Sequence, residues 1–218
     1  MSYTIQTYRD FLIFPKEFLP LNSISKTITH NRILLGKPYN KEMFLFNESE
    51  YYTESITLKF DNYEEMKAIR DFFIDIKGKK EFFWFYSYNT EIQLKEDIKK
   101  GNSSFKAELP LFNIMLDYRP LFIFVPEINF ATQIIDVADL GFDVRETYKK
   151  IGKYITFDPF PSYISLQECK SFYFMFLGSS SKDDITFDFI DLVRGKVTFS
   201  FKEITIAHYK KLGLFKEG

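Results

Sequence analysis

The chain has little of the material from which most catalytic and metal sites are built. Its 218 residues include one cysteine, Cys169, and two histidines, His30 and His208. One cysteine excludes an intramolecular disulfide framework and a multi-cysteine metal site, and a lone cysteine more often packs than reacts. Neither histidine has a second ligand at helix or hairpin spacing. Surface or hydrogen-bonded roles are therefore favoured for both histidines.

A charge excess of one sign and a long apolar run are also missing. The chain balances 29 basic residues against 30 acidic residues, for a formal net charge of −1. This balance argues against nucleic-acid binding by bulk electrostatics and against a polybasic membrane anchor. No apolar run approaches the ~20 residues of a membrane-spanning helix, and residues 1–10 are too polar for a signal peptide. We therefore expect a soluble protein without a membrane span and without nucleic-acid specificity, made in a reducing cytoplasm.

Motifs that mark catalytic and nucleotide-binding sites are missing as well. No serine stands in a Gly-x-Ser-x-Gly elbow, and no glycine-rich loop leads into Lys-Ser or Lys-Thr. Acidic residues that could bind a cation occur in three places: Glu64 and Glu65, Asp183 and Asp184, and Asp136, Asp139 and Asp143. Calcium needs several oxygens converging from a shaped loop, which the two pairs lack and the triplet barely allows. The sequence predicts no enzyme, no catalytic, metal-binding or cofactor-binding residue, and no cofactor.

Aromatic residues, in contrast, are abundant. The chain has 27 phenylalanines and 14 tyrosines. One interpretation is base composition, because Phe, Tyr, Ile, Lys and Asn all use AT-rich codons and all are plentiful here. The other is that an aromatic-rich β protein builds its cores and interfaces from these rings. The sequence alone gives the two interpretations equal weight.

The clearest local pattern predicts a strand, a helix and a tight turn in succession. Residues 56–60 alternate apolar and polar types, as in a half-buried strand. Asp61 stands where a helix N-cap is expected, with Glu64 three residues later, and the helix is expected over residues 61–77. Gly78 follows as the predicted C-cap glycine in a left-handed conformation. The expected apolar face has spacings of three and four: Met66, Ile69, Phe73 and Ile76.

An aromatic strand is predicted after the turn, at residues 82–86, with the sequence Phe-Phe-Trp-Phe-Tyr. Three consecutive phenylalanine or tryptophan positions in a strand must place at least one ring inward. Core packing is therefore favoured over stacking on single-stranded nucleic acid. We expect one face of this strand to be buried and the other to be available to a partner.

Further strands are predicted on both sides of this unit, for about ten in all. Alternating or apolar runs mark five of them, at residues 104–109, 121–125, 133–137, 153–157 and 170–177. Residues 178–181, Gly-Ser-Ser-Ser, are expected to form a loop. Residues 145–151 are expected to form a short helix or a turn. A hairpin is predicted from residues 185–189 and 197–201.

The predicted organisation has three parts. Residues 1–55 are expected to be an extended N-terminal arm with the first strands, irregular because prolines interrupt it. Residues 56–206 are expected to be a β-rich core domain with one helix, and residues 207–218 a C-terminal tail. The fold class is mainly β: a β-sandwich or split β-barrel with one flanking α-helix at about residues 61–77.

Three stretches of sequence share a pattern with one known family. A helix ending in Lys-Gly-Lys and followed by Phe-Trp is carried by Phe72, Phe73, Gly78, Phe83 and Trp84. A polar segment then leads to Asp97, Ile98 and Gly101. Near the C-terminus the pattern continues with Asp184, Ile185, Phe187, Val197, Phe199, Phe201 and Glu203. Together these stretches resemble bacteriophage minor tail proteins, a family also found in gene-transfer-agent tails. The family has a proline after the Phe-Trp strand, where this chain has Tyr-Ser-Tyr at residues 86–88.

The resemblance implies a virion structural protein without catalytic residues. The expected protein is a distal-tail or tail-hub component whose copies form a ring, of six or alternatively three, joining the tail tube to baseplate or fibre proteins. Its fold is expected to be tail-tube-like, with strands pairing across subunits. Its expected location is the virion tail, after assembly in the host cytoplasm. An alternative is a carbohydrate-binding or fibre-anchoring β module of a tail tip, and a weaker one is a tail-associated hydrolase, which would need two facing carboxylates.

We expect the purified protein to have no hydrolytic activity, because the sequence offers no nucleophile and base at a catalytic spacing. Assays against peptidoglycan, polysaccharide and ester substrates should give rates equal to buffer. Activity that disappears on substitution of a single Asp or Glu would contradict this expectation.

Overall fold

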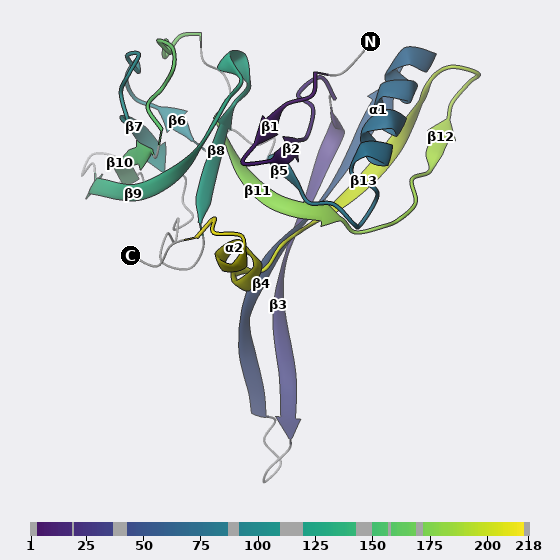
Figure 1. Cartoon of the computed structure of the whole chain (residues 1–218), viewed down its shortest axis with the longest axis horizontal. Helices are drawn as coiled ribbons and strands as arrows, with labels where there is room; N and C mark the ends of the chain where they lie inside the picture. The colour runs from purple at the N-terminus through teal and green to yellow at the C-terminus, as the bar shows by residue number, and fades with distance from the viewer. Residues whose placement is uncertain are drawn as a thin grey trace. The chain divides into compact units, whose positions relative to one another are not determined.

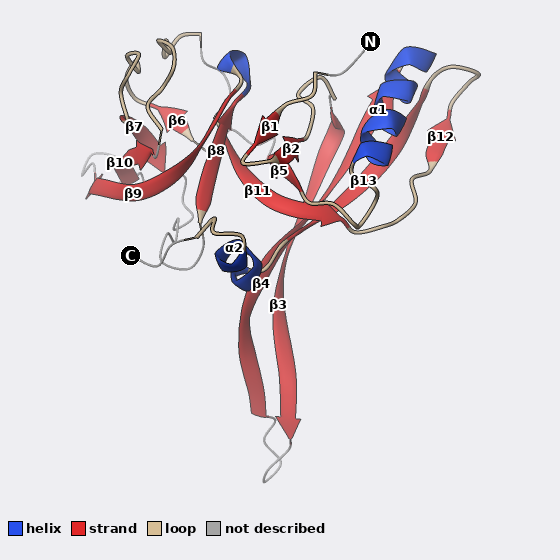
Figure 2. Ribbon diagram, in the orientation of Figure 1, coloured by secondary structure: helices blue, strands red, loops and turns tan. Residues whose placement is uncertain are grey.

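The computed structural model is mostly β, with strands over 43% of the chain. It describes residues 4–18, 20–36, 43–86, 92–109, 120–142, 150–156, 158–168 and 172–215, and only the backbone at 20–36, 43–54, 108–109, 138–142 and 150–152. Two α-helices occur in the described part, α1 (Tyr63–Asp75) and α2 (Ile206–Lys211) (Figure 2). The prediction of a mainly β fold is confirmed. The second helix was not predicted.

The chain divides into two compact units. The first combines Met1–Phe83 with Leu177–Lys211, and the second combines Trp84–Phe176 with Leu212–Gly218. Each of the three predicted parts, 1–55, 56–206 and 207–218, is one continuous segment. Each observed unit instead joins two segments that are distant in the sequence (Figure 1).

The sheet of the first unit is centred on two antiparallel strands, β4 (Met43–Phe60) and β13 (Gly195–Glu203). Their register runs from Gly195 opposite Phe60 to Lys202 opposite Thr53. On its other edge β13 pairs with β12 (Phe187–Phe189) and with the end of β11 (Tyr173–Ser180). The outer edge of β4 pairs with β3 (Pro20–Gly36). The predicted C-terminal hairpin is thus present, as β12 and β13.

Strict alternation gives β4 and β13 one buried face and one polar face. The buried face carries apolar side chains that are at most 2% exposed: Ile56, Leu58, Phe60, Val197, Phe199 and Phe201. On the polar face, hydroxyl pairs join the strands, Ser55 with Ser200 at 2.8 Å and Thr57 with Thr198 at 3.0 Å. Cross-strand hydroxyl pairs of this kind stabilise a sheet modestly. The alternation therefore fixes which face receives the helix.

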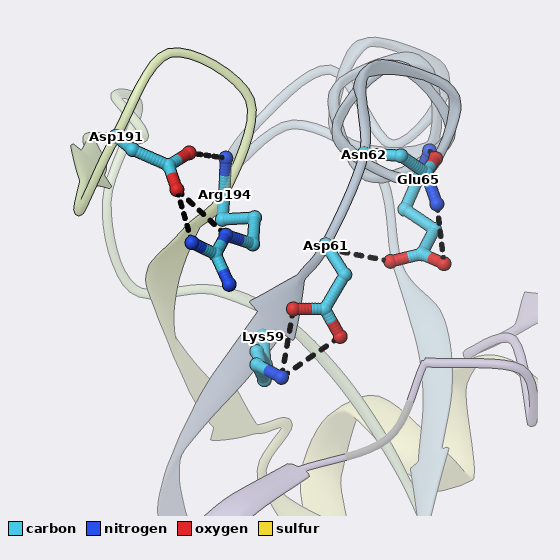
Figure 3. Close-up of polar contacts among 6 residues, drawn as sticks. All are labelled: Lys59, Asp61, Asn62, Glu65, Asp191 and Arg194. Carbon is cyan, nitrogen blue, oxygen red and sulfur yellow. Dashed lines mark hydrogen bonds and ion pairs between the residues drawn. The ribbon is translucent and has the colours of Figure 1, made fainter.

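The N-cap of helix α1 lies one residue later than predicted (Figure 3). Its N-cap is Asn62, whose Oδ1 accepts a hydrogen bond from the Glu65 backbone N–H at 2.9 Å. The Glu65 carboxylate accepts in return from the Asp61 backbone N–H at 2.8 Å. The expected pair, Asp61 and Glu64, was wrong because the Asp61 carboxylate is bound to the Lys59 ammonium. Asn62 and Glu65 instead satisfy free N–H groups at the helix start.

The buried face of α1 covers the apolar face of the sheet. Ile69, Phe73 and Ile76 are buried as predicted, and the Phe73 ring lies 5.9 Å from that of Phe199. Met66 is only half-buried, whereas Phe72, which was not predicted to be buried, is 1% exposed. The predicted stripe was therefore placed slightly too far to one side of the helix. The reason is that Phe72 contacts a segment to which the sequence analysis gave no core role.

That segment is the N-terminal stretch with β1 (Thr7–Tyr8) and β2 (Phe11–Ile13). Phe14 follows β2 and is 1% exposed. Its ring centre lies 5.2 to 6.4 Å from those of five other phenylalanines: Phe18, Phe72, Phe83, Phe199 and Phe201. Aromatic pairs at such distances contribute about 0.5–1.5 kcal/mol each beyond burial. The first strands expected within residues 1–55 are present, since four strands begin among the described residues there. The expected irregular character was wrong, because Phe14 lies at the centre of this core.

The turn after α1 has the predicted left-handed backbone at Gly78, although the C-cap of the helix is Ile76 and not Gly78. Lys77 has φ 50° and Gly78 has φ 62°. A side chain at Gly78 would place its Cβ 3.3 Å from Asp183 Cα. Asp183 also accepts a hydrogen bond from the Lys79 backbone N–H at 3.2 Å. Gly78 therefore serves both the turn and the close approach of the loop that precedes β12.

The second unit has the strand order β5-β11-β8-β9-β10-β7-β6. These strands are β5 (Phe83–Tyr86), β6 (Gln93–Leu94), β7 (Ser104–Leu109), β8 (Leu121–Val125), β9 (Phe130–Phe142) and β10 (Lys150–Thr156). The short 3₁₀ helix η2 (Pro126–Ile128) connects β8 to β9. All five residues of β8 are buried, as in a strand covered on both faces.

The aromatic strand β5 is likewise buried along its whole length, with Phe83, Trp84, Phe85 and Tyr86 at most 2% exposed. The expectation of one face available to a partner was wrong. Trp84 lies 4.6 Å from Phe122, and Phe85 lies 5.7 Å from Phe176. Neighbouring positions of the strand therefore both meet rings of the second unit.

Residues 178–181 were expected to form a loop, but Gly178 to Ser180 pair with Glu203 to Phe201 and complete β11. The expectation was wrong because small residues can end a strand when a neighbouring strand supplies hydrogen bonds. The predicted short helix or turn at residues 145–151 lies mostly outside the described residues, although 150–151 belong to β10.

Helix α2 is held against the sheet of the first unit by Tyr209, which is 1% exposed. The Tyr209 hydroxyl accepts a hydrogen bond from the Leu177 backbone N–H at 2.8 Å and donates one to the buried Glu203 carboxylate at 3.2 Å. The predicted C-terminal tail thus begins with a docked helix. Within the described residues, neither helix has the length and apolar character needed to cross a bilayer.

We expect Gly78→Val to destabilise the protein by about 1–2 kcal/mol from the strain of a β-branched side chain at positive φ, and further because its Cβ would lie 3.3 Å from Asp183 Cα. Gly213→Val is the matched control, since Gly213 has φ 69° but no atom within 4 Å of its added Cβ. Thermal melts should show the larger loss for Gly78→Val. An unchanged midpoint for Gly78→Val would mean that the turn has another geometry.

Candidate interaction surfaces

The most unusual exposed feature is an apolar turn between β12 and β13. Four of its side chains are exposed, Phe189 by 56%, Ile190 by 72%, Leu192 by 97% and Val193 by 49%. We call these four residues the apolar tip. Isolated apolar side chains on a surface are ordinary, but a contiguous group marks an interaction site. The tip is therefore the first candidate functional surface.

The apolar tip is ordered by the one acidic residue within it (Figure 3). One Asp191 carboxylate oxygen accepts from the Val193 and Arg194 backbone N–H groups at 3.0 and 2.8 Å. The other accepts from the Arg194 guanidinium at 2.6 Å. The Ile190 backbone N–H also donates to the Arg194 carbonyl at 2.8 Å. The turn is thus cross-linked by polar contacts while its apolar side chains point to solvent.

These contacts lower the pKa of Asp191 to about 2, mainly through the Val193 backbone N–H and then through Arg194. The Arg194 pKa is raised by the same carboxylate, with a smaller contribution from Asp61. Since Asp191 and Arg194 neutralise each other, the apolar tip has no net charge. Its base is held by ring contacts of Phe60 with Phe187 and Phe189, at 5.7 and 5.6 Å.

The second candidate surface is a long ribbon formed by β3 and β4. Strand β13 follows β4 only as far as Thr53. Beyond it, residues 28–36 of β3 pair with residues 43–52 of β4 and, among the described strands, with nothing else. We call these two segments the arm. An isolated two-stranded hairpin is marginally stable in water, so the arm is the second candidate surface for pairing with another chain.

The far end of the arm has an apolar sequence. Three residues of β3 and four of β4 carry it: Ile33, Leu34, Leu35, Met43, Phe44, Leu45 and Phe46. The register places Ile33 opposite Leu45 and Leu34 opposite Phe44. Because consecutive positions of a strand alternate between its faces, both faces of the ribbon contain apolar positions. The arm and the apolar tip lie at opposite ends of β4, since Gly195, at the foot of the tip, pairs with Phe60.

The residues that carry the family resemblance have structural roles. Phe72, Phe83, Phe199 and Phe201 surround Phe14 in the core of the first unit. Phe73 and Val197 are also buried. The Glu203 carboxylate accepts a hydrogen bond from the Tyr209 hydroxyl. Trp84 lies against Phe122 in the second unit.

Two loops of the second unit are joined by the middle part of the pattern. Asp97 accepts hydrogen bonds from the Tyr163 hydroxyl and from the Leu166 backbone N–H. Ile98 and Ile164 form a two-way backbone bridge, and the Gly101 N–H donates to the Phe160 carbonyl at 2.9 Å. The Asp97 pKa is lowered by the Leu166 N–H and then by Tyr163. Of the remaining residues, Asp184 is exposed, Ile185 and Phe187 are half-buried, and it is Asp183 that meets Gly78.

No protein-family model matches the chain, and comparison with curated proteins finds no match. The resemblance to phage tail proteins thus rests on the core and loop residues just placed. They explain how the chain folds, whereas the apolar tip and the arm lie outside the shared pattern. The signal for the tip was present in the sequence as a run of apolar residues where a hairpin turn should be polar.

The described histidine and aspartate side chains that were considered as possible metal ligands or catalytic groups do not lie close together. His208 hydrogen-bonds Thr205 at 2.8 Å, and the side chain of His30 lies outside the described part. Cys169 and Asp143 also lie outside it, and Asp136 caps its own neighbour, Val137. Within the described residues, no three His, Cys, Asp or Glu side chains are placed to hold a metal ion.

We expect the Arg194 backbone amide to report an acid transition near pH 2. The folded pKa of Asp191 lies below its ordinary value of about 3.9. The carboxylate therefore stabilises the turn fully above pH 4 and loses this effect as the pH falls through about 2. An NMR titration of the Val193 and Arg194 amide shifts should give that midpoint, and Asp191→Asn should abolish it. A midpoint near 4 would show that the turn contacts do not persist in solution.

Proposed function

We propose that the chain is a virion structural protein of a phage tail. In this proposal it is a distal-tail or tail-hub subunit whose copies form a ring connecting the tail tube to baseplate or fibre proteins. The observation that carries the proposal is the arm, a two-stranded ribbon without a third described strand, extending from a well-packed sheet. The residues that carry the family resemblance also support a structural role, because they pack in a protein core.

The arm favours assembly over isolated function. A long unpaired strand edge invites pairing with another chain, and natural monomers usually shorten or cover such edges. The 17-residue strand β3 has β4 as its one partner among the described strands. A neighbouring copy or another tail protein that added a strand here would remove the exposed edge.

The separation of the two surfaces favours a ring. From Phe60 to Tyr52 the strand extends about 26 Å, at about 3.3 Å per residue, so arm and tip are far apart on one subunit. Different surfaces at opposite ends form heterologous contacts, which close into a ring when the rotation allows. Six copies are proposed because of the expected distal-tail position, with three as the alternative. The finer fold assignment, a sandwich or split barrel of tail-tube type, belongs to this proposal.

One observation favours the alternative of a carbohydrate-binding or fibre-anchoring module. Tyr163 is 55% exposed and is oriented by Asp97. An oriented exposed ring beside a carboxylate can serve as a platform for a sugar. Binding to a glycan array that is lost in Tyr163→Ala would favour this alternative over the structural role.

The test of the proposed function is the presence of the chain in purified virions, together with a variant lacking the arm. Thr29 and Tyr51 are register partners, so residues 30–50 can be replaced by Asn-Gly to close a short hairpin. Removal of all of residues 1–52 is unsuitable, because it would delete Phe14, which lies at the centre of the first unit's core. We expect the shortened protein to melt within a few degrees of wild type but not to enter particles. Wild type absent from particles would overturn the proposal.

A further inference from the structure

We propose that the apolar tip of one copy docks on the apolar far end of the arm of a second copy. This contact deepens the proposed function and rests on it, because it names the surfaces through which neighbouring copies meet. Four exposed apolar side chains form the tip, and seven apolar residues form the end of the arm. Within the first unit the two lie at opposite ends of β4.

The order of the apolar tip supports a docking role. A flexible apolar turn would lose conformational freedom on binding, at a cost that weakens the complex. Here the Asp191 contacts fix the turn before any partner arrives. Leu192, the most exposed of the four at 97%, has the position of an anchor side chain that enters a partner surface.

Charge favours a protein partner over an anionic lipid or a nucleic acid. Asp191 and Arg194 form an ion pair, so they add no net charge to the tip. At its base, exposed Asp188 pairs in register with exposed Lys196, which pairs in turn with Lys59. Lys59 is itself bound to Asp61. A rim in which positive and negative groups alternate gives no net attraction to a surface of one charge sign.

The use of two different surfaces favours the arm of a second copy over a second tip. Two tips facing each other would join two copies and leave both arms uncovered. A tip against an arm differs because every copy uses both surfaces, so a closed ring gains one such contact per copy.

Complementation between two defective variants tests this contact. The tip variant is Ile190→Asp with Leu192→Asp, and the arm variant replaces residues 30–50 by Asn-Gly. Each loses one half of the contact and keeps the other. We expect wild type to form higher oligomers in native mass spectrometry, each variant alone to be monomeric, and an equimolar mixture to form a dimer of one copy of each. The single contact in the mixture should be at least tenfold weaker than the wild-type assembly.

Leu166→Asp is the matched control, because Leu166 is 43% exposed but lies in the second unit, outside the tip. It should assemble as wild type does, and all variants should melt within a few degrees of wild type. A tip variant that still forms full oligomers would overturn the inference while leaving the proposed function in place, if wild type is found in virions. A mixture that stays monomeric, or wild type that is monomeric at all concentrations, would also overturn it.

Discussion

The pairing of β4 with β13 is the interaction on which the first unit depends. It brings residues 53–60 beside residues 195–202 and turns both sets of apolar side chains to the same face. Helix α1 and Phe14 then cover that face with rings. The same strand β4 continues as the arm, and the foot of the apolar tip is pinned where β13 meets Phe60. One ladder thus positions the core and both candidate surfaces.

The distribution of side chains explains why the structural role is the best-supported proposal. Among the described side chains, aromatic residues lie mainly in the interior, where Phe14 and Phe105 each meet several other rings. Polar contacts outside the core order turns and loops, as Asp97 and Asp191 do. Two features are not needed to build this core: the exposed apolar turn, and the ribbon of β3 and β4, which has no third described strand. Both are typical of a chain that is completed by neighbours.

Local signals predicted local elements well. The strands at residues 104–109 and 121–125 were predicted with their observed bounds. The two ends of α1 were predicted within two residues, and the left-handed conformation of Gly78 was predicted correctly. Contacts between distant segments could not be predicted from periodicity. Phe14 gave no core signal because its apolar run, residues 11–14, is very short and ends at Pro15. Helix α2 gave none because its docking depends on Tyr209 meeting Leu177. The apolar tip was missed because residues 190–193 were treated as part of a turn.

The central claim is that copies of this chain assemble through surfaces of the first unit. An image reconstruction of the protein within the purified tail tests it most directly. The account predicts a closed ring of equivalent copies, in which every arm and every tip is covered by a neighbouring subunit. A tail in which the protein is present as single separated copies, with arm and tip exposed to solvent, would contradict it.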